Sequence, residues 1–193
     1  MEEIGLMRLI PTMTVIMPGD AYETEQATRA AAAMEGPFYI SVAGGALPID
    51  TPEGERSFKV GKAVLLREGH DVTLIGVGPT VGDTLRAGDL LASKGIAARI
   101  LNMHTVKPID KDAVLRAAAE TRLIITIEEH TVIGGLGGAV AEVLADAGAG
   151  TPLKRLGLQD VFACMVGSHR DVKERFGITA EAIVKEVLNR VSR

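Results

Sequence analysis

The chain has 193 residues, of which 47% are apolar, and this suits one complete domain plus part of another, since domains commonly hold about 100 to 150 residues. Aromatic residues make up only 3%, Trp is absent and the net charge is −4 without any dense basic run, which argues against nucleic-acid binding and aromatic membrane belts. With a single cysteine, no signal peptide and no apolar run of about 18 residues, we expect a cytoplasmic protein without membrane contact.

The first 43 residues predict fewer elements than a domain needs. Two helices and two strands bury too little apolar surface to fold alone, so we expect the end of a domain that begins elsewhere. Asp20, with Glu23 three residues later, fits a capping box, which favours an N-cap over a catalytic acid. The predicted elements are a helix over residues 1–10 that is closed by Pro11, a strand at 14–18, a helix from 20 to 34 and a strand at 38–42.

Residues 44–58 are rich in Gly and Pro, which predicts an extended linker. Residues 59–193 then alternate strand and helix patterns, which predicts an α/β fold with a mostly parallel five-stranded sheet and helices on both faces. The turn at residues 68–71 has a hairpin-like spacing and predicts that the first strand is antiparallel. Strands are expected at 63–66, 72–77, 97–101, 123–127 and 152–156, and helices at 80–94, at 108–120 with Asp110 as N-cap, from 136 to near 148, near 170, and after Thr179.

The stretch from Ile124 to Leu144 holds the strongest candidates for chemistry. Glu128, Glu129 and His130 follow an apolar strand, and its carboxyl end is where open α/β sheets place ligands or partner contacts. These three residues could act as acid, base or metal ligands. Adjacent carboxylates on a loop more often form salt bridges or cap a helix, and we favour that interpretation. No histidine pair has zinc spacing, and neither a nucleophile elbow nor a Walker motif occurs.

Two glycine-containing turns could bind an anion through backbone N–H groups. The turn Gly76-Val-Gly-Pro79 follows a strand and opens a helix, but it lacks the third glycine of the dinucleotide fingerprint. The cluster Gly134-Gly-Leu-Gly-Gly138 could form an anion nest. Tight turns and close helix packing also require glycine, and we favour this structural interpretation.

Several motifs, in order over nearly the whole chain, resemble the C-terminal part of transketolases, especially the small subunit of split forms. Residues 128–142 are similar to their C-terminal domain, residues 102–110 to its strand-to-helix segment, and residues 3–20 to the end of their pyrimidine-binding domain. The resemblance implies thiamine-diphosphate-dependent transfer of a two-carbon ketol unit between sugars or sugar phosphates, as in pentose phosphate metabolism. It assigns residues 1–43 to the pyrimidine-binding domain and residues 59–193 to the transketolase C-terminal domain.

The same resemblance implies that the catalytic machinery lies outside this chain. The family's activating glutamate would precede the first residue, and the domain that holds the diphosphate and a divalent metal such as Mg²⁺ has no counterpart, so we expect no catalytic, cofactor-binding or metal-binding residue here. An N-terminal transketolase subunit, or missing N-terminal domains, would supply them, and we expect a homodimer. Under this interpretation Glu128, Glu129, His130, Gly134 and Gly135 belong to a packing or interface loop.

Ser41 and Gly44 are the substrate-facing candidates, because they follow the strand after which the family usually carries a phosphate-gripping arginine. Here the segment Ser41-Val-Ala-Gly-Gly45 contains no arginine, and neither serine nor glycine replaces its charge. An unphosphorylated or modified acceptor would therefore fit. The alternative function is a non-catalytic assembly module, like the similar domains of 2-oxoacid dehydrogenases and deoxyxylulose-phosphate synthase, although the Glu-Glu-His and Gly-Gly-Leu-Gly combination favours transketolase.

Overall fold

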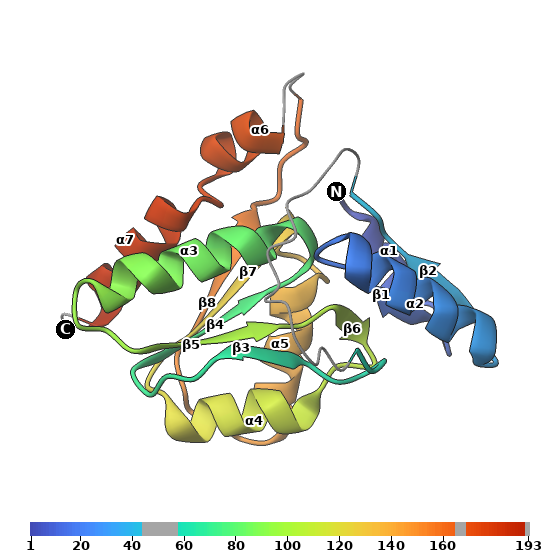
Figure 1. Ribbon diagram of the computed structural model, residues 1–193, viewed down its shortest axis with the longest axis horizontal. Coiled ribbons are helices and arrows are strands. Elements are labelled where there is room, and N and C mark those ends of the chain that lie inside the picture. The colour runs from blue at the N-terminus through green and yellow to red at the C-terminus, as the bar shows by residue number, and fades with distance from the viewer. Residues whose placement is uncertain (44–57, 165–168, 192–193) are drawn as a thin grey trace.

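The computed structural model describes residues 1–43, 58–164 and 169–191. A central sheet carries helices on both faces, and the N-terminal helices and strands lie against one end of it (Figure 1). Most of the linker predicted at residues 44–58, including Gly44, lies outside the described residues.

The central sheet has the predicted five strands and is mostly parallel, in the order β3-β5-β4-β7-β8. Its edge strand β3 is antiparallel, as expected, but it pairs with β5, so the predicted hairpin with β4 is wrong. The turn cannot fold back because both edges of β4 are already paired, and Gly69 crosses directly over the backbone of Ala98. The strands are β3 Val64–Arg67, β4 Val72–Gly76, β5 Ala98–Asn102, β7 Ile124–Thr131 and β8 Leu153–Leu158.

Alternating side chains of the central strands supply two apolar layers, one on each face of the sheet. Leu74 and Ile125 face the layer beneath α3 and α7, whereas their neighbours Ile75 and Ile124 face the layer beneath α4 and α5. The helices are α3 Val81–Ala92, preceded by a 3₁₀ turn at Gly78–Thr80, α4 Lys111–Glu120, α5 Leu136–Asp146, α6 His169–Phe176 and α7 Ala180–Val191. Within the described ranges, every helix is too short or too polar to cross a bilayer.

The N-terminal segment contributes a second, three-stranded sheet in the order β2-β1-β6. Its parallel strands β1 and β2 come from this segment, whereas β6 belongs to the later part of the chain and pairs antiparallel with β1. The sequence did not predict β6, because this strand depends on pairing with β1, which lies about 90 positions earlier in the chain. The elements are α1 Glu3–Leu9, β1 Thr14–Ile16, α2 Ala21–Ala33, β2 Phe38–Ile40 and β6 Thr105–Lys107.

Both predicted aspartate caps are confirmed. The Oδ1 atom of Asp20 accepts a hydrogen bond from the Glu23 amide at 2.9 Å, and Oδ1 of Asp110 accepts one from the Ala113 amide at 3.2 Å. Each carboxylate therefore satisfies an otherwise unpaired amide at a helix start, which supports the structural interpretation of Asp20.

Candidate functional site

The prediction that Glu128, Glu129 and His130 lie on a loop is wrong, because β7 continues through Thr131. All three side chains are buried, with exposed fractions of 0%, 5% and 0%. The strand continues because it gains partners after its apolar run: Thr131 pairs with β8 across a bulge, and its amide donates to the Met1 carbonyl at 3.0 Å. Buried polar residues at a strand end must find hydrogen bonds within the protein.

Glu128 binds the first amides of α5. Its Oε2 accepts a hydrogen bond from the Leu136 amide at 2.6 Å, and its Oε1 accepts one from the Gly137 amide at 2.8 Å. The start of this helix does form an anion site, as a glycine nest can, but the anion is the chain's own carboxylate. Burial raises the pKa of Glu128 to about 7, whereas the two amide bonds and the nearby Arg155 and Arg8 guanidinium groups lower it.

The glycine cluster allows the carboxylate and the helix to pack this closely. A Cβ at Gly135 would collide with the Glu128 carboxylate and would lie 2.6 Å from His130 Nδ1. A Cβ at Gly137 would lie 2.7 Å from the Arg155 side chain. The close-packing interpretation of these glycines is therefore confirmed, since any larger residue would displace buried groups.

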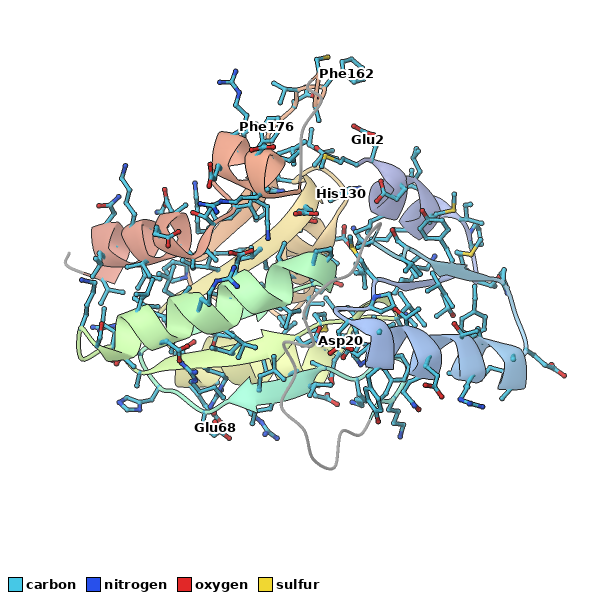
Figure 2. All side chains as sticks on the ribbon, turned by 45° about the horizontal axis from the view of Figure 1, so that its top comes forward. Glu2, Asp20, Glu68, His130, Phe162 and Phe176 are labelled. Carbon is cyan, nitrogen blue, oxygen red and sulfur yellow. The ribbon has the colours of Figure 1, made fainter. Side chains whose placement is uncertain are left out.

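His130 joins β7 to the N-terminal helix. Its Nε2 accepts a hydrogen bond from the Gly5 amide at 3.1 Å, and its Nδ1 lies 2.6 Å from the Thr131 carbonyl oxygen. An atom that accepts from an N–H cannot carry a proton, so these bonds assign the proton to Nδ1 in a neutral ring. The imidazole lies at the end of β7 that faces α1 (Figure 2). His130 is therefore a contact between two parts of the fold rather than an exposed base.

Arg8 of α1 strengthens this contact. Its Nη1 donates to the carbonyl oxygens of Gly134 at 2.6 Å and Gly135 at 3.2 Å, and its Nη2 pairs with Glu142 at 2.6 Å. Gly134 has a φ of +75°, and a Cβ there would lie 3.2 Å from Gly5 Cα. The β7–α5 corner, which we define as residues 128–137, thus receives α1 through hydrogen bonds, an ion pair and close backbone packing.

The other glycine turn is also covered by the N-terminal segment. Gly78 has a φ of +56°, and a Cβ there would lie 2.7 Å from the Met17 side chain. Beside it, Glu23 accepts hydrogen bonds from the Gly19 amide at 2.8 Å and from Asn102 Nδ2 at 2.7 Å. The sequence suggested only a capping role for Glu23, because its bond to Asn102 crosses 79 positions of the chain.

The crevice that would hold a ligand in an open α/β sheet is therefore filled by the chain itself. It lies at the carboxyl ends of β4 and β7, whose following helices α3 and α5 cover opposite faces of the sheet. The α5 amides bind Glu128 and the Gly78 turn is covered by Met17. In the described part of the chain, no three His, Cys, Asp or Glu side chains gather as a metal site would require. These residues do not fit a diphosphate and its metal.

His104 and Ser41 lie outside the β7–α5 corner. The His104 ring is fully buried, stacks on Phe58 at 4.2 Å, and bonds Thr105 Oγ1 through Nδ1 at 2.9 Å. Burial lowers its pKa to about 4, so it is uncharged at neutral pH. Ser41 follows β2, and its amide donates to the Ile16 carbonyl at 2.9 Å. A substrate-facing role for Ser41 or Gly44 stays a prediction.

Comparisons with known proteins agree with this architecture. The family model "Transketolase, C-terminal domain" matches residues 61–183. The chain is 45% identical over 186 residues to 6-deoxy-6-sulfo-D-fructose transketolase subunit SqwH of Clostridium sp. strain MSTE9, covering 96% of this chain and 56% of that protein. It is 35% identical over 193 residues to a subunit of the apulose-4-phosphate transketolase of Phocaeicola vulgatus, covering 100% of this chain and 61% of that protein.

A solved structure is similar over the same extent. It is described as a split gene transketolase in an inactive beta4 tetramer, and it matches with a TM-score of 0.91 and 36% identity over 98% of this chain and 61% of its own. The chain thus spans 56 to 61% of the length of these three proteins. The matched model and the shared fold together show that this chain belongs to the transketolase family and contains its C-terminal domain.

Proposed function

We propose that this chain is part of a thiamine-diphosphate-dependent, transketolase-like enzyme that transfers a two-carbon ketol unit between sugars or sugar derivatives. The observation that carries the proposal is the similarity to transketolase subunits over nearly the whole chain. The filled crevice, where Glu128 and His130 bind backbone amides of the chain itself, supports a cofactor site elsewhere in the enzyme. Their role is then to attach a segment of the pyrimidine-binding domain, residues 1–43, to the C-terminal domain, residues 59–193. Catalytic residues and the cofactor with its divalent metal belong to an N-terminal subunit or further domains.

We propose that the enzyme binds its donor or acceptor sugar without an arginine after β2. The described residues at this edge, Ser41, Val42 and Ala43, are uncharged. Neither a hydroxyl nor a methyl group replaces the bidentate grip of a guanidinium on phosphate. Relatives named for 6-deoxy-6-sulfo-D-fructose and for apulose 4-phosphate support the idea that substrates vary among such subunits.

We further propose that the chain alone is inactive and self-associates. The similar solved structure is described as an inactive beta4 tetramer, which supports both points. Sedimentation of the isolated chain should give a mass above that of one copy, and a strictly monomeric mass would count against self-association.

Calorimetry and a reconstituted assay test the enzymatic proposal. The isolated chain should not bind thiamine diphosphate with Mg²⁺, because its anion-binding amides are already occupied. After co-purification with an N-terminal transketolase subunit, ketol transfer should appear with 6-deoxy-6-sulfo-D-fructose as donor. Micromolar cofactor binding by the chain alone would contradict the assignment of its residues, and an inactive complex that binds the cofactor would contradict ketol transfer.

A further inference from the structure

A groove of about 810 Å³ lies beside β8, the edge strand of the central sheet. Its walls come from β8, the segment that follows this strand, α6 and the first two turns of α7. None of the described residues that line it belongs to the filled crevice at the carboxyl ends of β4 and β7. A groove of this size can bury most of a small organic molecule, so it is a second place where the chain could hold a ligand.

The lining of this groove is strongly cationic. Among the described residues, four positively charged side chains line it, against one carboxylate. The cations are Lys154, Arg155, Arg175 and Lys185, and the carboxylate is Glu186. The chain as a whole carries a net charge of −4, so this positive surplus is local to the groove. Charges of one sign that line a concave surface reinforce each other's field, which attracts anions to the groove.

Two of the four cations are free to bind a ligand. Lys154 faces Glu186 at 3.9 Å, and Arg155 already donates to a backbone carbonyl oxygen at 2.9 Å. Arg175 and Lys185 are exposed, and neither forms a hydrogen bond or ion pair with another described residue. Their N–H groups are therefore available to an oxyanion, and the planar guanidinium of arginine suits the oxygens of a phosphate group in particular.

The rest of the lining contains exposed apolar side chains. Phe162 is 83% exposed and Val161 is 53% exposed, while Phe176 is half-buried in the wall. Figure 2 shows Phe162 and Phe176 at the same end of the molecule. An exposed aromatic ring beside free cations suits a ligand that has both an anionic group and a flat or apolar body, because each part then finds a matching surface.

We propose that this groove binds a small organic phosphate with a flat ring, such as a nucleotide. The phosphate oxygens accept hydrogen bonds from Arg175 and Lys185, and the ring packs on Phe162. This site goes beyond the proposed function, because its lining includes no residue of the β7–α5 corner or of residues 1–43. Thiamine diphosphate fits the groove poorly, since its positively charged thiazolium ring would lie among the same cations.

Calorimetry of the intact 193-residue chain in Mg²⁺-free buffer tests the proposal, with ATP, inorganic triphosphate and adenosine as probes. ATP should bind more tightly than either of the others, because it alone offers both the charge and the flat ring. Arg175→Ala and Lys185→Ala should each weaken ATP binding by about tenfold, as loss of a charge-assisted hydrogen bond does. Phe162→Ser should weaken the binding of ATP by roughly tenfold and leave that of triphosphate unchanged.

Lys111→Ala is the matched control, because Lys111 is an exposed lysine on α4 that does not line the groove. All the changed side chains are exposed, so the thermal melting temperatures of the variants should equal that of wild type.

The outcomes are distinct. Absence of ATP binding, or equal binding by wild type and both cation variants, would overturn the proposal. An equal loss in Lys111→Ala would also overturn it, because overall charge rather than the groove would then attract the anion. Triphosphate binding as tightly as ATP would overturn the assignment of an organic ligand. The experiment includes no catalytic subunit, so its result is independent of whether the assembled enzyme transfers ketol units.

Discussion

Replacing Glu128 by glutamine isolates the role of the buried carboxylate. The side chain keeps its shape, but one of its two oxygens becomes an NH₂ group that faces an amide of Leu136 or Gly137. One hydrogen bond is lost and two donors oppose each other in a buried position, which costs about 1 to 3 kcal/mol of unfolding free energy. That cost applies while Glu128 of the wild type is protonated.

The pH dependence gives the sharper test. The folded-state pKa of Glu128 is about 7, above its ordinary value of 4.5, so the folded protein binds this proton more tightly than the unfolded chain. The stability from this group is fully present below pH 4.5 and is lost as the pH rises through about 7. This separation of pKa values corresponds to about 3 kcal/mol. Glu128→Gln has no such proton. As the pH rises, its deficit in unfolding free energy relative to wild type should therefore shrink by about 3 kcal/mol and approach zero or reverse.

Urea unfolding of both proteins between about pH 4.5 and about pH 8 measures this difference directly. Subtracting one curve of unfolding free energy against pH from the other cancels the contributions of all other titrating groups that the two proteins share. A difference that stays constant across the range would refute the reasoning, because Glu128 would then keep the same charge in the folded and unfolded states. A difference that grows in favour of wild type with rising pH would show that the α5 amides outweigh burial.

Four further substitutions probe the same region and one strained residue. Gly135→Ala should destabilise the protein by about 3 kcal/mol, because its methyl group would lie 2.6 Å from His130 Nδ1. Gly138→Ala, whose methyl group meets nothing closer than 3.5 Å, should instead stabilise α5 by about 0.5 to 1 kcal/mol. Equal effects of the two variants in urea unfolding would contradict the packing argument. His130→Ala removes the acceptor of the Gly5 amide. Amide hydrogen exchange should therefore accelerate by about tenfold or more in α1, while the β4 amides stay protected. Uniform acceleration over both elements would mean that no local contact was lost. Thr12 has a φ of +62°, so Thr12→Asn should raise the melting temperature, by relieving about 0.5 to 1 kcal/mol of backbone strain, and a lower melting temperature would argue against strain.

Local patterns predicted most of the elements because their causes are local. Alternating and 3.6-residue periodicities predicted the five central strands and their helices, and the preference for aspartate at helix starts predicted the capping roles of Asp20 and Asp110. The glycine cluster could be interpreted from sequence because glycines this close together are typical of a tight turn and of close helix packing.

The errors share a different cause, which is contact between distant positions. Strand β6 forms because β1 pairs with it, and β7 continues past its apolar run because Met1 and β8 supply partners. The acceptor role of His130 depends on Gly5, which is 125 positions away. A single sequence contains no signal for such pairs, so the triplet at residues 128–130 looked like an exposed loop when it is a buried contact.

Several of the contacts that hold α1 and its flanks in place are made to backbone atoms. His130 binds the Gly5 amide, and Lys107 Nζ binds the carbonyl oxygens of Arg8 at 2.9 Å and Ile10 at 2.6 Å. Backbone atoms are the same whatever side chains a helix carries, so the exposed side chains of α1, Leu6 and Leu9, can change without loss of these bonds. The contact between α1 and the β7–α5 corner can therefore stay constant while the outer side of α1 diverges in sequence.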